Sequence, residues 1–443
     1  MRRPEFLLAG ALVATGCFAG GSAPSTPNPP PVHYVPEAMG PVAGASAPTN
    51  AAYVPPATPV VPAPKPAEPK PASTPAKAAA PVDVAKLLAA GGTALKTVMA
   101  APEKYRFQVL YGVVNEGTSP TLARNGFRAD VEYYFPASSM KVPIALATYE
   151  RLGAARAKDK PGLTRDAILK YGGAEPATTT LARDTWRSLI VSDNTCSNRI
   201  LAFVGHREAH ETLWRHGYGS TRIRAGFATG AEIDPAEASP RIDVQLSPGG
   251  NDVLPARKSD LKLPPNDAKE LGIGNAAIVD GRRVEGPLSF ADKNAIKLKE
   301  LQDALVQIMR PDLLPSATPR TIASDDLAYV RQALGTFPSE SGLAGFDRNI
   351  VADYQLSPFL RGIERVKKRG TFQIFSKVGQ AYGFLIHNAY VVDKATGRSF
   401  FLIAAVFANP DGVMNDDNYG YDSISFPALA DVGEIFTRHA FGS

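Results

Sequence analysis

From Val82 onward the chain alternates between stretches with helical hydrophobic spacing and stretches with strand-like spacing. Apolar residues three or four apart predict helices, whereas short apolar runs bounded by turn residues predict strands. Helices are expected over 84–99, 142–149, much of 153–219, 294–309, 324–333 and 426–439; strands are expected over 106–114, 126–135, 372–375, 384–392 and 400–408. This mixture of elements indicates a domain built from both helices and a sheet.

The first 81 residues show no such periodicity. Residues 1–17 read as a signal peptide, with Arg2 and Arg3 before a short apolar run. Its end resembles a bacterial lipobox, so we expect a lipid on Cys17; the alternative is ordinary secretion after cleavage. Residues 18–81 are rich in proline, alanine, serine and threonine, which predicts a disordered linker. The globular domain is therefore expected over 82–443.

Composition limits the other possibilities. The chain has 443 residues, 44% of them hydrophobic, with a formal net charge of +5. It contains no dense run of lysine and arginine with interleaved aromatics, so we expect no nucleic-acid partner. The two cysteines, Cys17 and Cys196, are too few for a thiolate metal cluster. His206 and His210 lie four residues apart but have no evident third ligand, so no metal and no cofactor are expected.

The strongest chemical signal is Ser138, at the predicted start of a helix and three residues before Lys141. Residues three apart share one face of a helix, so the hydroxyl and the amine can meet. A serine becomes a useful nucleophile only beside a base, and a lysine acts as a base only when its pKa is lowered. Ser139 is the competing hydroxyl, but its spacing turns it away from Lys141.

Two later motifs accompany this pair. Ser192-Asp193-Asn194 follows an apolar helical run, and Lys377-Val378-Gly379 follows a predicted strand. In this order the three motifs form the signature of the class A β-lactamases and penicillin-binding proteins, which are serine acyl-enzymes. The stretches Pro136–Pro143, Ser192–Asn198 and Thr221–Ile223 resemble the corresponding segments of class A enzymes.

The resemblance implies an α+β fold of the β-lactamase/transpeptidase type. Its antiparallel five-stranded sheet would be flanked by helices and joined to an all-helical subdomain. Ser138 would be the nucleophile, Lys141 its base and Ser192 the proton shuttle. Asn194 would bind the substrate amide or Lys141, and Lys377 would supply positive charge. The substrate would also meet Gly379 and Gln380, whose N–H group would complete an oxyanion hole with that of Ser138.

The sequence departs from the class A pattern at two positions. Val378 stands where the family has serine or threonine, and Phe227 stands where it has the glutamate that activates the deacylating water. Three nearby acids are candidates to replace that glutamate: Glu232, Asp234 and Glu237. The stretch 228–289 is longer than the family's loop and is expected to be an irregular insertion at the rim of the site.

Three functions remain open. The first is a β-lactamase-like hydrolase that forms an acyl-enzyme on Ser138 and releases it slowly because Phe227 replaces the glutamate. The second is a D-Ala-D-Ala peptidase or transpeptidase acting on peptidoglycan stem peptides. The third is a non-catalytic binding lipoprotein of the cell envelope. In each case we expect an exported monomer, either periplasmic or anchored to the membrane through Cys17.

Overall fold

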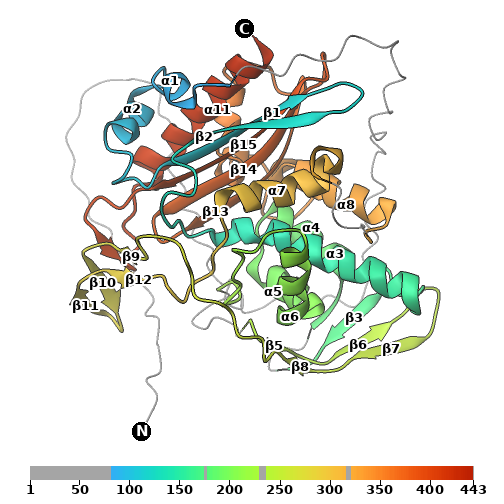
Figure 1. Cartoon of the computed structure of the whole chain (residues 1–443). Coiled ribbons are helices and arrows are strands. Elements are labelled where there is room, and N and C mark those ends of the chain that lie inside the picture. The colour runs from blue at the N-terminus through green and yellow to red at the C-terminus, as the bar shows by residue number, and fades with distance from the viewer. Residues whose placement is uncertain (1–80, 174–176, 229–235, 316–320, 443) are drawn as a thin grey trace.

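The structure is a computed structural model, and it describes residues 81–173, 177–228, 236–315 and 321–442 (Figure 1). The expected signal peptide, and the expected linker except for its last residue, lie outside the described residues. Among the described residues, no helix combines the length and the apolar character needed to cross a membrane.

A five-stranded sheet forms the centre of the molecule, with the strand order β13-β14-β15-β1-β2. Every neighbouring pair in it is antiparallel. The strands are β1 (Gln108–Asn115), β2 (Thr121–Phe127), β13 (Phe372–Ala381), β14 (Phe384–Asp393) and β15 (Ser399–Phe407). Strands β14 and β15 are buried along almost their whole length, because helices cover both faces of the sheet. The expected fold class is confirmed.

One face of the sheet packs against the first and the last helices of the described chain. The C-terminal helix α11 (Phe426–Phe441) lies on this face with α1 (Val84–Leu88), α2 (Thr93–Ala100) and α10 (Leu360–Ile363) (Figure 1). Their apolar side chains form one core with alternate residues of the strands. Burying an apolar side chain of this size stabilises a fold by about 1.5–3 kcal/mol.

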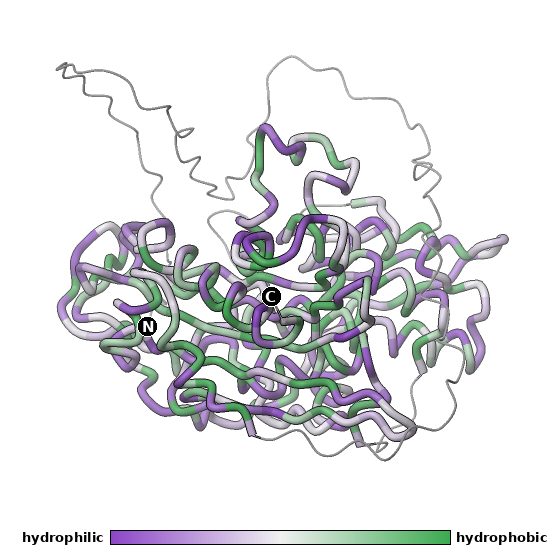
Figure 2. Tube along the Cα trace, turned by 90° about the horizontal axis from the view of Figure 1, so that it is seen from above, coloured by the Kyte–Doolittle hydropathy of each residue, from purple (hydrophilic) through white to green (hydrophobic). Residues whose placement is uncertain are grey.

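The other face packs against α7 (Leu298–Met309), which leads to a subdomain built around α3 (Lys141–Lys158). This subdomain also contains α4 (Leu181–Ile190), α5 (Asn194–Val204), α6 (His206–Arg215) and α8 (Ser324–Gly335). A second, larger core joins it to the sheet. Seen from above, the trace alternates between hydrophobic and hydrophilic stretches over short distances, as expected of elements with one buried face (Figure 2).

A small sheet adds to the helical subdomain and was not predicted. It has the order β4-β3-β6-β7 and consists of β3 (Ile168–Tyr171), β4 (Ala177–Thr180), β6 (Ile242–Gln245) and β7 (Asn251–Leu254). Two of its strands come from the expected loop 228–289, which therefore contains regular structure where it is described. Val244 and Leu254 face the core of the subdomain, and this burial orders the stretch.

The remaining elements are short. The strands are β5 (Ala238–Ser239), β8 (Arg257–Lys258), β9 (Gly272–Ile273), β10 (Ala276–Val279), β11 (Arg282–Glu285), β12 (Leu288–Ser289) and β16 (Val413–Met414). A further helix, α9, spans Asp353–Leu356. Strands β11, β10 and β16 form a three-stranded sheet, and β9 pairs with β12.

Two expected boundaries in the N-terminal half of the domain are wrong. The helix predicted over 84–99 is two helices, because Gly92 takes an extended conformation between them. The strand predicted over 126–135 ends at Phe127. Beyond it, Tyr133 donates its backbone N–H to the Lys269 carbonyl and its hydroxyl to the Asn294 carbonyl. Those contacts hold the segment before Ser138 as a buried loop.

Candidate active site

Ser138 lies in a 3-10 turn, Ala137–Met140, that runs directly into α3. The predicted position at a helix start is therefore confirmed, and the Ser138 residue is half-buried. Ala137 has a φ of +46°, a strained value for a residue with a Cβ, and such strain is commonly stored at functional sites. Ser139 is fully buried and donates its hydroxyl to the Pro136 carbonyl at 2.5 Å, so it is not a free hydroxyl.

Lys141 is buried and makes three hydrogen bonds to the Ser192 loop. Its Nζ donates to the Ser192 carbonyl at 2.6 Å, to Ser192 Oγ at 3.1 Å and to Asn194 Oδ1 at 2.7 Å. The ring centroid of Phe227 lies 4.7 Å from the same nitrogen. Among the described residues, no hydrogen bond to the Ser138 side chain is recorded.

Lys377 reaches the same serine from the other side. Its Nζ donates to Ser192 Oγ at 3.0 Å and to the Val378 carbonyl at 2.9 Å. Lys377 lies within β13, because the strand runs on to Ala381 instead of ending at Phe375 as expected. The Ser192 hydroxyl thus accepts hydrogen bonds from two lysines that are 236 positions apart in the sequence (377 − 141).

Both amines are held where their charged forms are disfavoured. Burial lowers the pKa of Lys141 well below its usual 10.5, and the neighbouring Lys377 charge lowers it further. Burial also lowers the pKa of Lys377 to about 7. Neither lysine forms an ion pair with a carboxylate of the described residues. A lysine with this environment can hold a neutral amine near neutral pH, which a base requires.

The Ser192-Asp193-Asn194 turn is fixed by Asp193. The Asp193 carboxylate accepts the Cys196 N–H at 2.9 Å, which caps α5, and it accepts Arg187 Nε at 2.8 Å. These hydrogen bonds lower the pKa of Asp193 against the opposing effect of burial. Ser192 has a φ of +60°, so this turn also stores backbone strain. The ion pair between Asp193 and Arg187 links the turn to α4, which contains Arg187.

The end of the segment 222–228 lies against Lys141 and its hydrogen-bond partner Asn194. Asn198 clamps Phe227 with two hydrogen bonds, from the Phe227 N–H to Asn198 Oδ1 at 2.7 Å and from Asn198 Nδ2 to the Phe227 carbonyl at 2.8 Å. Asn194 Nδ2 donates to the Ala228 carbonyl at 2.6 Å. Phe227 therefore stands beside Lys141 with an aromatic ring and no carboxylate.

The structure describes only one of the three acids considered as replacements for the family's glutamate. That acid, Glu237, interacts electrostatically with His206, whose Nδ1 contacts Ser259 Oγ. Glu232 and Asp234 lie outside the described residues.

Gly379 brings β13 against the turn Ala137–Met140, which contains Ser138. A Cβ on this residue would lie 2.4 Å from the Pro136 carbonyl oxygen and 3.0 Å from the Ser139 nitrogen. Only glycine permits this approach without displacement of the backbone. Gln380 follows at an exposed position of the strand, opposite Leu385 of β14. The segment expected to supply an oxyanion hole is thus packed against the turn that contains Ser138.

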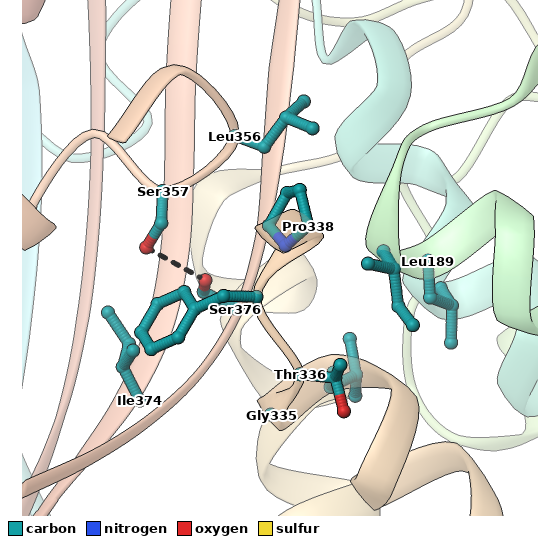
Figure 3. A pocket seen from close by; sticks show the side chains of 11 residues that line it. Leu189, Gly335, Thr336, Pro338, Leu356, Ser357, Ile374 and Ser376 are labelled. Carbon is teal, nitrogen blue, oxygen red and sulfur yellow. Dashed lines mark hydrogen bonds between the residues drawn. The ribbon is translucent and has the colours of Figure 1, made fainter. Parts of the chain in front are cut away.

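A small pocket lies beside Lys377 along the outer edge of β13. Leu189, Pro338, Leu356 and Ser376 contribute to its lining, and Ser376 lies 3.4 Å from Ser357 Oγ to Oγ (Figure 3). Its volume is about 20 Å³, whereas ligand sites usually measure about 300–1,000 Å³. A space of this size holds about one water molecule, so it is not the substrate site.

The structure brings Lys141, Ser192, Asn194 and Lys377 into one hydrogen-bonded group. Ser138 lies three residues before Lys141, in the turn that leads into α3, and no hydrogen bond within the described part of the chain joins its side chain to this group. Sequence reasoning missed three contributors: Asn198, Arg187 and His387. Asn198 lies four residues after Asn194, on the same helical face, which was a usable signal. His387 pairs with Val378 across β13 and β14, and burial and Lys377 hold its pKa well below the usual value.

The two helical histidines, His206 and His210, make local hydrogen bonds. His210 Nε2 accepts the Ile223 N–H at 2.9 Å, and its Nδ1 lies 2.8 Å from the His206 carbonyl. His206 Nδ1 lies 2.9 Å from Ser259 Oγ. Within the described part of the chain, no group of three possible ligands gathers around a metal position.

Residues 94–249 match the model of the beta-lactamase enzyme family. A search of curated proteins finds no match. Similar solved structures include a beta lactamase from Burkholderia vietnamiensis (14% identity, 80% of this chain and 98% of that one, TM-score 0.43) and a beta-lactamase from Desulfarculus baarsii DSM 2075 (14%, 80% and 98%, 0.45). A third is a beta-lactamase from Streptosporangium roseum (15%, 78% and 97%, 0.45).

Proposed function

We propose that this chain, whose residues 94–249 belong to the beta-lactamase enzyme family, is a serine hydrolase that forms an acyl-enzyme on Ser138. Its substrates would be β-lactams or related amides. One observation carries the proposal: two buried lysines without a carboxylate partner among the described residues both donate to Ser192 Oγ. A packed core has no need of two buried amines, and burying them costs several kcal/mol.

The first step uses Lys141 as the base. A neutral amine has two N–H groups and one lone pair. Neutral Lys141 could therefore still donate to two of the three oxygen atoms that it now contacts. Its lone pair would accept the proton of the Ser138 hydroxyl. Ser138 Oγ then attacks the carbonyl carbon of the amide. The N–H groups of Ser138 and Gln380 would stabilise the oxyanion, and one such donor contributes about 3–4 kcal/mol.

Ser192 would pass the proton to the leaving nitrogen. Its hydroxyl already accepts hydrogen bonds from both lysines, so its lone pairs are used and its single proton is free to be donated. As the carbon–nitrogen bond breaks, Ser192 protonates the nitrogen and recovers a proton from Lys141. The two amines thus orient this one proton toward the substrate.

Release of the acyl group would be slow. Hydrolysis needs a base that activates water beside the ester, and Phe227 presents a hydrocarbon ring 4.7 Å from Lys141 Nζ. The ring removes the family's base and shields the amine from solvent. We therefore expect acylation to be faster than deacylation.

Phe227 beside Lys141, in place of the glutamate, also favours a second candidate, a D-Ala-D-Ala peptidase or transpeptidase. Such an enzyme shares the acylation residues and passes its acyl group to an amine or to water without a class A glutamate. We also propose that the protein is exported, with or without a lipid on Cys17. A non-catalytic binding lipoprotein is the third candidate.

Two simultaneous measurements separate these functions. The lipid-free domain is incubated with a chromogenic cephalosporin, and product formation and intact protein mass are followed together. Repeated turnover supports the hydrolase. A persistent adduct with little turnover favours the peptidase class. No adduct at any cephalosporin concentration tested would leave only the binding protein; the Ser138→Ala variant is the control.

A further inference from the structure

Three half-buried side chains converge beside the nucleophile turn: Phe135, Tyr382 and Lys293. The rings of Phe135 and Tyr382 meet edge to face, with centroids 5.1 Å apart and an angle of 84°. Lys293 Nζ lies 5.1 Å from the centroid of the Tyr382 ring and 3.4 Å from its hydroxyl. They come from three separate stretches of the sequence.

The cluster is anchored from beneath by Phe290. This ring is fully buried and contacts Phe135 at 5.8 Å and Tyr382 at 5.4 Å, both edge to face. The Lys293 N–H bonds the Phe290 carbonyl, which ties the lysine to the same short turn. Phe290 follows β12 at the end of the long stretch in which this chain departs from the class A pattern.

Tyr382 is held in a strained conformation. It has a φ of +53° in the turn between β13 and β14. The next residue, Gly383, donates its N–H to the Tyr421 hydroxyl at 2.8 Å, and this bond fixes the turn. A bulky residue at positive φ is costly, and it persists where the surrounding structure imposes it. The side chain is thus presented at a defined place.

The cluster adjoins the two segments that meet at the Ser138 turn. Phe135 precedes Pro136, whose carbonyl packs against Gly379, and Tyr382 follows Gly379 by three residues. The two aromatic residues therefore flank the contact between the nucleophile turn and β13, on the side of Gln380. An acyl donor whose carbonyl lies between Ser138 and Gln380 would place a side chain near these rings.

The chemistry of the cluster is specific. Lys293 forms no ion pair with a carboxylate of the described residues; the adjacent Asp292 lies 3.8 Å from Arg224 instead. A half-exposed ammonium beside aromatic rings suits a ligand that is flat and negatively charged. The rings would pack against the flat group, and the ammonium and the Tyr382 hydroxyl would meet the anion.

We propose that Phe135, Tyr382 and Lys293 form a subsite for an aromatic, carboxylate-bearing side chain of the acyl donor. The subsite determines substrate preference and takes no part in bond making. The inference rests on the proposed function for its place in catalysis, but its ligand chemistry can be tested without catalysis.

The test compares benzylpenicillin with its α-carboxy derivative, which differs by one carboxylate on the side chain. The rate of Ser138 acylation by each is measured by mass spectrometry at increasing concentration. We expect the wild type to prefer the α-carboxy compound. We expect Lys293→Gln to reduce that preference about fivefold, because the half-saturation concentration of the α-carboxy compound rises. Lys394→Gln is the matched control, because Lys394 is exposed and lies beyond the far end of β14. Equal preference in the wild type and in Lys293→Gln would overturn the subsite.

Binding of phenylmalonate provides a second measurement that needs no acylation. Titration calorimetry should show weaker binding to Lys293→Gln than to the wild type, with phenylacetamide as the uncharged comparison. If no penicillin acylates Ser138 but phenylmalonate still discriminates between the two proteins, the proposed function fails and the subsite stands. If phenylmalonate binds both proteins equally or neither, the subsite is refuted.

Discussion

The contact of Gly379 with the turn that contains Ser138 offers a sharp structural test. In Gly379→Ala the new Cβ would lie 2.4 Å from the Pro136 carbonyl oxygen, whereas ordinary contact begins at 3.4 Å. The obstacle is backbone, so β13 and the turn must separate by about 1 Å. Overpacking of this kind costs about 1–3 kcal/mol of stability. A displacement of 1 Å between reacting groups reduces a rate on the order of 100-fold.

The assay follows acylation of Ser138 by benzylpenicillin together with thermal unfolding. We expect acylation to fall on the order of 100-fold while the variant remains folded at the assay temperature. Gly219→Ala is the control, because a Cβ there has no heavy atom within 4 Å and the residue does not require positive φ. If Gly379→Ala acylates at the wild-type rate with an unchanged melting temperature, β13 does not pack on the turn as described.

Three further predictions concern the charges and the ring around Lys141. Phe227→Glu should speed deacylation at least tenfold, since a positioned base contributes about 10²–10⁴-fold; Phe227→Leu should not, and equal release rates in both would disprove the role of the ring. Lys377 has a folded pKa of about 7 against 10.5 ordinarily, so the unfolded chain binds more protons between these values and stability rises with pH. In denaturation experiments at pH 7 and at pH 10, Lys377→Met should reduce the gain in unfolding free energy between the two pH values by on the order of 4 kcal/mol. A gain equal to that of the wild type would contradict this prediction. Asp193→Ala, which removes the α5 cap and the Arg187 ion pair, should lower stability by about 1–3 kcal/mol; an unchanged melting temperature would argue against the turn's dependence on Asp193.

The sequence predicted two central strands and the C-terminal helix well because their hydrophobic runs are long. Strands β14 and β15 and helix α11 were expected within a few residues of their observed bounds, whereas β13 continues to Ala381, beyond the predicted end at Phe375. The helix start at Ser138 was also expected, because a proline and a change of hydrophobic period mark it. Where local pattern and tertiary packing agree, the sequence is sufficient.

Other parts depend on contacts that no local pattern reveals. The small sheet formed by β3, β4, β6 and β7 joins segments some 70 residues apart, and each of its strands has only four residues. The contact of Phe227 with Lys141 depends on the clamp from Asn198, which joins α5 to a loop 29 residues further along the chain. The loop before Ser138 resembled a strand in the sequence because it is rich in aromatic residues, which are also typical of strands.

The most direct test is peptide mapping of the full domain after incubation with benzylpenicillin. The account predicts a mass increase equal to one whole penicillin, located on the peptide that contains Ser138 and absent from Ser138→Ala. It also predicts that the adduct forms faster as pH rises, because Lys141 must be neutral. An unmodified protein, or an adduct that persists in Ser138→Ala, would contradict it.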